Sequence, residues 1–373
     1  MSASIDLGEI LCELGPRFAE AAEENDAMDR FVFENYQALR RNRVFSALVP
    51  VELGGGGAGH ADMCEFLRRL AGYCPATALA LSMHQHLVAA AVANHRAGRP
   101  GRALLEKVAG GELVLVSTGA NDWLDSNGTA ERADGGYRVT ATKPFASGAP
   151  AGDIIVTSAV HDGPDGAEVL HFPLPLKAEG VSLADDWRTL GMRATGSQTV
   201  RLDNVFVADT AIGLRRPRGP FHPAFAVIVT VAMPLIMSVY LGAAESAFAI
   251  ACRRARVRKA DAATSMLTGE LANHLALARL AVADLVRLVN GYDFHPDAQL
   301  ASDVLVRKPF AAKAVPAPAE TALQVAGGAG FYRKAGLERL LRDLHGARFH
   351  PLPEKRQQLF TGRLALGLEP VES

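Results

Sequence analysis

The stretch GGYRVTATKPFASGAPAGDIIVTSAV (residues 135–160) decides the fold. It holds two runs rich in β-branched and aromatic residues, separated by a loop of Ala, Ser, Gly and Pro, which is typical of neighbouring strands. Further short runs of the same kind are ELVLVST (112–118), EVLHFPLPL (168–176) and QTVRLDNVFVA (198–208). With turns such as DGG and DGPDG between them, they predict a small antiparallel barrel or sandwich of about 100 residues.

Helical patterns lie on both sides of this β segment. In DMCEFLRRLAGYC the apolar residues recur at the three- and four-residue steps of one helix face. The following ATALALSMHQHLVAAAVANH is apolar nearly all round, which predicts a helix buried among others. We therefore predict a mainly α fold with a central β domain. Its parts are an N-terminal helical domain (1–112), a middle β domain (113–215) and a C-terminal helical bundle (216–373).

Charge and cysteine usage limit the classes of partner. The chain has 39 basic and 40 acidic residues, a formal net charge of -1. This balance gives no bulk attraction to nucleic acid or to an anionic membrane, so we expect a small-molecule substrate or a protein partner. The 4 cysteines show no zinc spacing and predict no metal site. Together with an N-terminus that lacks the pattern of a secretory signal, they favour a cytoplasmic location.

Residues 223–244 contain no charged side chain, and a segment of this length could span a bilayer. Thr230, Pro234 and Ser238 interrupt it, and it continues into the amphipathic ESAFAIACRRARVRK (245–259). We therefore predict a buried core or interface helix and no membrane span.

Several local motifs have more than one interpretation. LGGGG (53–57) lacks the preceding strand and the Lys-Ser/Thr pair of a phosphate loop, which favours a flexible turn. GGAGF (327–331) interrupts a helical pattern, and both a helix break and a cofactor contact explain it. His84 and His86 lie on different helix faces, which argues against joint metal ligation. No serine elbow or zinc-protease motif supports a hydrolase.

Five motifs in a fixed order resemble the acyl-CoA dehydrogenase superfamily. They are LVPVELGGGGAGHAD, the STGAN strand end, GYRVTATKPFASGAPAGD, WRTLGMRATGSQTVRLDNVFV and QVAGGAGFYRKAGLERLLRD. The resemblance covers nearly the whole chain. It implies a helical N-terminal domain, a middle β-barrel, a C-terminal four-helix bundle, a homotetramer or homodimer, and a flavin held between the β domain and the bundle.

The resemblance also implies which residues contact the flavin. Ser117 and Thr118 match positions at the ring edge, and Phe145, Ala146 and Ser147 match the segment along its face near the reactive nitrogen. Arg193, Thr195 and Ser197 match a loop of the same pocket wall. Gln324, Gly327 and Gly328 match a helix end that meets the distal part of a neighbouring subunit's cofactor. Because the bundle lacks the family's Phe-Gly and Gln that grip FAD, either FAD or FMN fits.

Dehydrogenases of this family use a glutamate to remove a proton next to the thioester carbonyl. Aligned from Arg342-Asp343, that glutamate falls on Pro351, and the alternative position used in another branch falls near Ala232. Neither residue is a carboxylate. Glu354 lies three residues further on, where Lys355 and Arg356 would lower its pKa, so a solvated helix start is the favoured interpretation.

A different branch, the two-component flavin monooxygenases, lacks this glutamate and reacts reduced flavin with oxygen. Its Phe-x-Ser-Gly pattern matches residues 145–148, and its histidine after the Arg-Asp helix matches His350. His84 occupies roughly the position of a second pocket histidine in that branch. The resemblance thus implies Ser147, His84 and His350 as catalytic residues, with a separate flavin reductase as partner.

Three functions stay open at this point. The leading hypothesis is a reduced-flavin monooxygenase that hydroxylates or N- or S-oxidises a small molecule. The first alternative is an acyl-thioester dehydrogenase with Glu354 as a displaced base and an electron-transfer flavoprotein as partner. The second is a flavin-binding scaffold without turnover. The continuation HPLPEKRQQ (350–358) lacks the Asp-Pro that commonly follows this histidine in the monooxygenases.

Overall fold

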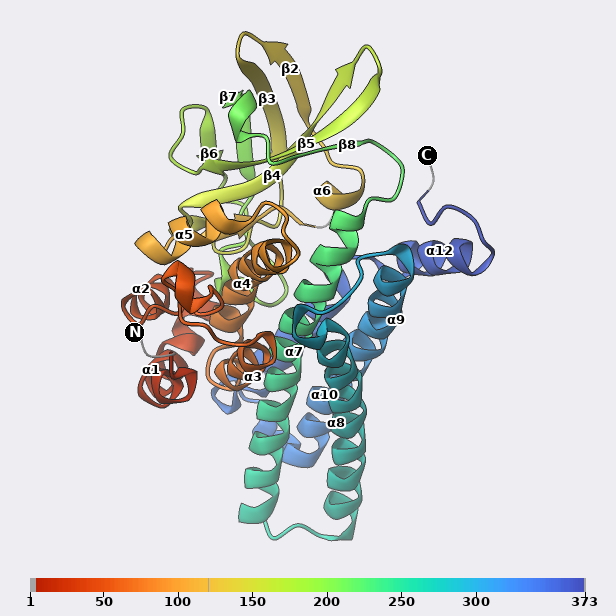
Figure 1. The fold of residues 1–373 in the computed structure, drawn as a ribbon. Helices are drawn as coiled ribbons and strands as arrows, with labels where there is room; N and C mark the ends of the chain where they lie inside the picture. Colours follow the sequence, from red (N-terminus) through yellow and green to blue (C-terminus); the bar gives the residue numbers. More distant parts are fainter. Residues whose placement is uncertain (1–4, 120, 372–373) are drawn as a thin grey trace.

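The computed structural model describes residues 5–119 and 121–371. Two helical regions adjoin a β domain that lies at one end of the molecule (Figure 1). The N-terminal helices are α1 (Leu7–Ala27), α2 (Phe33–Arg41), α3 (His60–Ala71), α4 (Pro75–Arg96) and α5 (Arg102–Gly111). The predicted fold class, mainly α with a central β domain, is confirmed.

Helix α4 is the central helix of the N-terminal region. Pro75 occupies its first position, where the missing amide hydrogen has no intrahelical partner to lose. From Pro75 to Ala93 every residue is buried. The helix packs against α3, α5, α7 and β1, as its all-round apolar pattern predicts.

The β domain is one eight-stranded sheet with the order β6-β7-β3-β2-β4-β5-β8, and β1 pairs with β4. Its strands are β1 (Leu115–Ser117), β2 (Thr129–Ala133), β3 (Gly136–Lys143), β4 (Ile154–Gly163), β5 (Gly166–Pro175), β6 (Val181–Leu183), β7 (Val200–Ala208) and β8 (Leu214–Pro217). Most pairs are antiparallel, but β4 runs parallel to β1 and β2. Pairing does not join β6 to β8 in the described part of the chain, so the expected barrel is a sheet with two edges.

Strand β3 positions one wall of the site described below. Its side chains alternate between buried and exposed, with Tyr137, Val139, Ala141 and Lys143 on the buried face. Strand β7 pairs with it antiparallel, from Gly136 opposite Ala208 to Lys143 opposite Val200. This register places the loop that leaves β3 beside the loop that enters β7.

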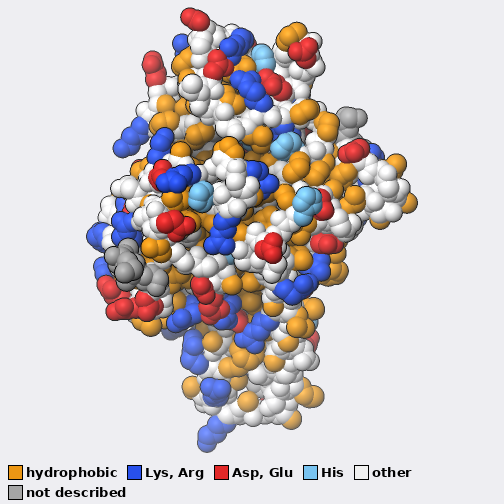
Figure 2. Space-filling view, viewed as in Figure 1, with side chains coloured by type: hydrophobic (Ala, Val, Ile, Leu, Met, Phe, Trp, Pro, Cys, Tyr) orange, Lys and Arg blue, Asp and Glu red, His pale blue; other side chains and the backbone are white. Residues whose placement is uncertain are grey.

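The C-terminal region is a bundle in which α7 packs against α8, α9, α10 and α11. The helices are α7 (Pro223–Val257), α8 (Ala262–Val289), α9 (Ala298–Ala314), α10 (Pro316–Ala326), α11 (Leu337–Leu344) and α12 (Glu354–Ala365); the short α6 (Asn121–Leu124) lies between β1 and β2. The far halves of α7 and α8 extend away from the β domain as a stem (Figure 1). On this face, basic and acidic side chains are interspersed, and apolar ones are scattered over the stem (Figure 2).

Helices α4 and α7 are long and apolar enough to cross a membrane by composition alone. Their apolar windows are 100% and 94% buried inside the fold, which is the environment of core helices. Residues 223–244 thus form the buried core helix that their sequence predicts.

Candidate active site

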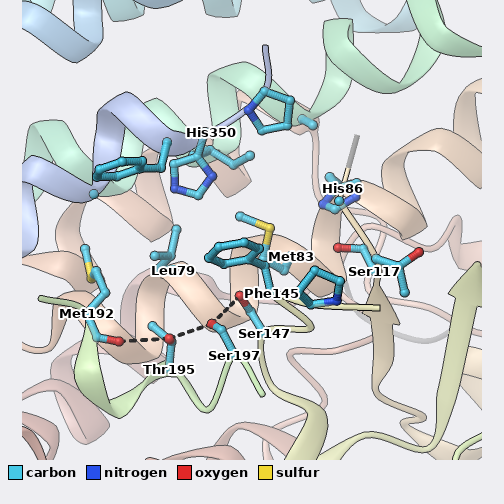
Figure 3. Close-up of a pocket in the computed structure, with 18 of the residues that line it drawn as sticks. Leu79, Met83, His86, Ser117, Phe145, Ser147, Met192, Thr195, Ser197 and His350 are labelled. Carbon is cyan, nitrogen blue, oxygen red and sulfur yellow. Dashed lines mark hydrogen bonds between the residues drawn. The ribbon is translucent and has the colours of Figure 1, made fainter. Parts of the chain in front are cut away.

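A cavity of about 690 Å³ lies where the β domain meets α4 and α7, and residues 345–353 close one side of it. One wall is apolar and comes from α4 and α7: Leu79, Met83, Ile228, Val229, Met233 and Ile236. Another wall comes from the ends of β1 and β3 and the loop before β7, and it carries hydroxyl groups (Figure 3). The volume lies in the range of pockets that bury a cofactor or a small substrate.

Three hydroxyl groups form a chain on the β-domain wall (Figure 3). Ser147 Oγ lies 2.7 Å from Ser197 Oγ, which lies 2.7 Å from Thr195 Oγ1. Thr195 Oγ1 donates to the backbone carbonyl of Met192 at 2.8 Å. Backbone hydrogen bonds from Gly148 N–H to Thr195 O and from Ala146 N–H to Gln198 O join the two loops that carry these residues. The chain therefore ends at Ser147, in the cavity lining.

Phe145 contributes an aromatic ring to the same wall. Its φ is 61°, a left-handed conformation that is strained for a bulky residue. The residue is 65% exposed, and its ring stands nearly perpendicular to that of Trp187, with 5.9 Å between centroids. Strain of this kind concentrates at ligand sites, where the surrounding structure holds it in place.

A buried ion pair supports this wall. Lys143 Nζ donates to Asp122 Oδ1 at 2.8 Å, and both side chains are almost fully buried. The second carboxylate oxygen accepts the hydroxyl protons of Thr118 and Thr157. Burial lowers the pKa of Lys143, while the negative charge of Asp122 opposes that shift. Because three donors saturate Asp122, its role is structural, and sequence reasoning missed it because no motif marks the pair.

The polar lining groups on the helical side of the cavity include two histidines and a tyrosine, with Arg342, His345 and Arg356 further along the C-terminal region. Tyr240 Oη lies 2.7 Å from His350 Nε2, and the centroids of the two rings lie 5.3 Å apart. Burial lowers the pKa of His350 to about 3 and that of His86 to about 4, and it raises the pKa of Tyr240. All three groups are therefore neutral near pH 7. The only sequence signal for Tyr240 is a phenol within a long apolar segment.

His84 does not line the cavity, which corrects the expectation that it is a catalytic residue. Its Nε2 bonds to the carbonyl of Phe45 at 2.8 Å, and its Nδ1 accepts from Leu115 N–H at 2.9 Å. Both ring nitrogens thus tie α4 to neighbouring backbone. His86 lines the cavity instead, and its Nδ1 has no complete hydrogen bond in the described structure, although the backbone of Ser82 lies near.

The flavin contacts predicted from sequence divide into two groups. Those that line the cavity are Ser117, Thr118, Phe145, Ser147, Thr195 and Ser197. Ala146 is buried behind the wall, and Arg193 turns away to donate to Thr189 O, with its Nε 3.8 Å from Asp29. Gln324, Gly327 and Gly328 lie at the end of α10, outside this cavity. Their contact with a neighbouring subunit's cofactor stays a prediction.

Carboxylates are scarce around the cavity. Asp122 is the only acidic residue among the described lining residues, and it is saturated by its donors. Glu354 begins α12, pairs with Lys313 at 2.6 Å and does not line the cavity. The bond from Lys313 lowers the pKa of Glu354. The two positions where the dehydrogenases place a glutamate, Pro351 and Ala232, do line it.

Comparisons with known proteins agree with this geometry. Models of the N-terminal and C-terminal domains of acyl-CoA dehydrogenase match residues 13–112 and 230–350, and the chain belongs to the acyl-CoA dehydrogenase superfamily. Amino sugar nitrososynthase RubN8 of Streptomyces rubradiris is 27% identical over 95% of this chain and 88% of its own length. Dibenzothiophene monooxygenase of Mycolicibacterium goodii is 25% identical over 92% of this chain and 89% of its own length.

A solved structure has the same fold. KijD3 in complex with FMN and dTDP-3-amino-2,3,6-trideoxy-4-keto-3-methyl-D-glucose superposes with a TM-score of 0.88, at 27% identity, over 97% of this chain and 93% of its own. The relatives are thus flavin-dependent monooxygenases and nitrososynthases of this fold.

The residues of the cavity fit a flavin. A tricyclic ring needs a flat apolar slot with hydrogen-bonding groups along one rim, and the cavity offers aromatic and aliphatic walls with Ser117 and Ser147 on the other side. The strained, exposed ring of Phe145 and the open volume beside it are what a bound ring would cover.

Proposed function

We propose that this chain is a reduced-flavin-dependent monooxygenase that oxidises a small, largely apolar molecule at carbon, nitrogen or sulfur. The observation that carries the proposal is a set of uncharged polar groups on the helical side of the cavity. These are His86, Tyr240 and His350, all neutral, with no carboxylate free to act as a base. Removal of a proton next to a thioester needs such a base, whereas hydrogen-bond donation beside a flavin can come from an uncharged hydroxyl or imidazole N–H.

Each group has a role in this proposal. Ser117, Phe145 and Ser147 hold the flavin, which supplies the reaction with oxygen when bound. Tyr240 keeps its proton because burial raises its pKa, so it donates to His350 Nε2 and leaves the imidazole proton on Nδ1. His350 would then present its Nδ1–H as a hydrogen-bond donor toward the flavin side, with Tyr240 holding the ring in this tautomer. The apolar wall of α4 and α7 excludes water from the substrate side.

The substrate follows from the lining. Apart from His86 and Tyr240, the side chains of α4 and α7 that face the cavity are aliphatic or thioether groups, which favour a molecule with an apolar ring or chain. Three cations also line the cavity, Lys143, Arg342 and Arg356, but none of them comes from α4 or α7. Lys143 pairs with Asp122, and Arg342 pairs with Asp26 and Glu338. We therefore propose a neutral heteroaromatic or similar apolar molecule in preference to a nucleotide-linked one.

Two partners complete the proposal. A separate reductase supplies reduced flavin, as the resemblance to the two-component flavin monooxygenases implies. A second copy of this chain covers Gln324, Gly327 and Gly328 and the stem, where Val257, Met266, Leu277 and Leu280 are exposed. Sedimentation of the purified chain tests the second point, since a monomer at all concentrations would contradict it.

The decisive experiment supplies the purified chain with FMN, a flavin reductase, NADH, oxygen and catalase, together with neutral heteroaromatic compounds such as indole. We expect a product that carries one atom from labelled oxygen, measured by mass spectrometry. A parallel sample mixes the oxidised flavoprotein with acyl-CoA under anaerobic conditions. Bleaching of the flavin by acyl-CoA, with no oxygenated product from any compound, would replace the proposal by the dehydrogenase.

A further inference from the structure

The hydroxyl chain of Thr195, Ser197 and Ser147 starts at a group that can only accept. The carbonyl of Met192 accepts from Thr195 Oγ1 at 2.8 Å, from Thr195 N–H at 3.1 Å and from Trp187 Nε1 at 3.2 Å. Since a carbonyl has no proton to give, the Thr195 proton must point toward Met192. The direction of the first hydrogen bond is therefore fixed by chemistry and not by a choice of rotamer.

This first bond sets the direction of the others. Thr195 has used its one proton, so the 2.7 Å contact with Ser197 requires the proton of Ser197. Ser197 has then used its own, so the 2.7 Å contact with Ser147 requires the proton of Ser147. Three hydroxyl protons thus serve three hydrogen bonds, and Ser147 Oγ keeps only lone pairs for the cavity that it lines.

The Met192 end of the chain is held firmly, so this polarity cannot easily reverse. Met192 adopts a left-handed conformation with φ 53°, and its N–H donates to the buried carboxylate of Asp343 in α11. The backbone of Gly191 beside it packs directly against α11, since a Cβ there would lie 2.3 Å from Arg342 O. The bundle therefore fixes the carbonyl that orients the hydroxyls of the β domain.

We propose that Ser147 selects the redox state of the flavin, because it presents an acceptor to a ring nitrogen that carries hydrogen only in the reduced form. The inference rests on the proposed function, which places a flavin beside Ser147. Reduced flavin donates from this N–H and leaves all three bonds of the chain intact. Oxidised flavin offers a bare nitrogen, so a bond with Ser147 would require one bond of the chain to be given up.

The expected size of the preference follows from the loss of one hydrogen bond. Such a loss corresponds to a factor of about three to ten in affinity. The binding step would thus retain the reduced flavin delivered by a reductase and release the oxidised flavin after the reaction. Ser197 and Thr195 act here as positioning residues, since they affect the flavin only through Ser147.

The test measures the dissociation constants of oxidised FMN, and of reduced FMN under anaerobic conditions, by fluorescence or calorimetry, without turnover. Ser197→Ala removes the acceptor for the Ser147 proton, so Ser147 becomes able to donate. We expect oxidised FMN to bind more tightly to this variant than to the wild type. The dissociation constant of oxidised FMN divided by that of reduced FMN should therefore fall by roughly three- to tenfold. This equals a potential shift of up to about 30 mV for the bound flavin.

Further variants separate this effect from a general loss of packing. Thr195→Val breaks the chain at its other end and should change the ratio in the same direction, even if Ser197→Ala folds poorly. Thr195→Ser keeps the hydroxyl and should leave the ratio unchanged. Ser147→Ala should also lower the ratio, but through weaker binding of reduced FMN, with no gain for the oxidised form.

The outcomes also separate the inference from the proposed function. If both forms of FMN bind but Ser197→Ala and Thr195→Val leave the ratio at the wild-type value, the redox selection by Ser147 is wrong and the flavoprotein assignment stands. If neither FMN nor FAD binds in any redox state, the proposed function fails and the inference fails with it.

Discussion

The pair of Tyr240 and His350 shows how burial sets the protonation of single side chains. Each group alone would lose favourable hydration in the cavity wall, but the 2.7 Å hydrogen bond satisfies one nitrogen and the phenol together. The same burial holds the pKa of His350 at about 3, so the ring is neutral at every working pH. The tautomer of this ring therefore depends on the phenol behind it.

Tyr240→Phe tests that arrangement because it removes only the hydroxyl. We expect turnover to fall by roughly tenfold with little change in the substrate's KM, since the ring and its packing remain. His350→Ala should cost more, roughly 100-fold. Tyr292→Phe is the matched control, because the Tyr292 hydroxyl is also buried, has no hydrogen-bond partner in the described structure and does not line the cavity. Equal turnover of Tyr240→Phe and the wild type would remove the phenol from the mechanism.

Sequence reasoning found Ser147 and His350 because a motif marks each of them, and both line the cavity. It chose His84 over His86, because the hydrophobic pattern of this helix does not distinguish the two histidines. Helix α4 is apolar all round, so no polar face indicates which of two nearby histidines lines the cavity. The choice depends on the packing of α4 against α7, which periodicity cannot predict.

Among the elements, α9 holds the segment that carries His350. Lys308 of α9 is 2% exposed, and its ammonium group donates to the carbonyls of Arg348 at 3.2 Å and Leu352 at 3.3 Å. Burial lowers the pKa of Lys308 to about 8, so the group is mostly charged at neutral pH. The two carbonyls flank His350, and Lys308 thus fixes the position of that ring from a distance.

Lys308→Met should release this segment. We expect faster amide hydrogen exchange in residues 348–352 and a several-fold fall in turnover, roughly threefold or more, because two backbone carbonyls lose their donor. Lys313→Met on the same helix is the control, since Lys313 is exposed and pairs only with Glu354. Unchanged exchange in 348–352 would show that the segment is held by its apolar contacts alone.

The contact between α7 and α3 depends on a single glycine. A Cβ at Gly242 would lie 1.8 Å from the carbonyl oxygen of Arg68, so the two helix backbones approach too closely for any side chain. Gly242→Ala should lower the free energy of unfolding by about 3 kcal/mol, the upper range for overpacking. Gly269→Ala in α8 meets nothing within 4 Å and should raise it by up to about 1 kcal/mol. Urea denaturation measures both, and equal stabilities for the two variants would contradict the close approach.

The order of helices and strands was predictable because local periodicity determines it. The pairing of the strands was not, since β3 pairs with β7 across the whole domain and β4 is joined to β1 in parallel. Glycines gave a partial signal. LGGGG was predicted as a turn, and Gly55 is required there because a Cβ would lie 2.2 Å from Val49 O. That close contact involves neighbours in space that the sequence alone does not identify.

Across the whole molecule, buried histidines make stability depend on pH. Burial lowers the pKa of five of them to about 3 or about 4: His60, His84, His86, His171 and His350. Below about pH 6.5 the unfolded chain protonates these rings while the folded chain does not, so the unfolded state binds more protons. Their contribution to stability is therefore present above about pH 6.5 and is lost as the pH falls toward 4.

Two buried acids, Asp343 and Glu112, work in the opposite direction, because burial raises the pKa of each. Burial raises the pKa of Asp343 to about 7, so its contribution to stability is present at low pH and is lost as the pH rises through about 7. Five histidines outweigh two acids, and we expect the urea midpoint to fall steeply between about pH 6.5 and about pH 5. Asp343→Asn should remove the loss of stability that this one group causes between about pH 5 and about pH 7.5. The urea midpoint of the variant should therefore fall more steeply on acidification than that of the wild type. A midpoint that stays level on acidification would contradict the histidine account.

The walls of the cavity belong to α4, the β domain, α7 and the segment after α11, which are distant in the chain. Any molecule that fills the cavity touches all of them at once and must leave before they separate. A ligand at 100 times its dissociation constant would add about 2.7 kcal/mol to the free energy of unfolding. The melting temperature thus reports whether the cavity is occupied. Compounds can be ranked by the rise in melting temperature that each one causes, before any reaction has been measured.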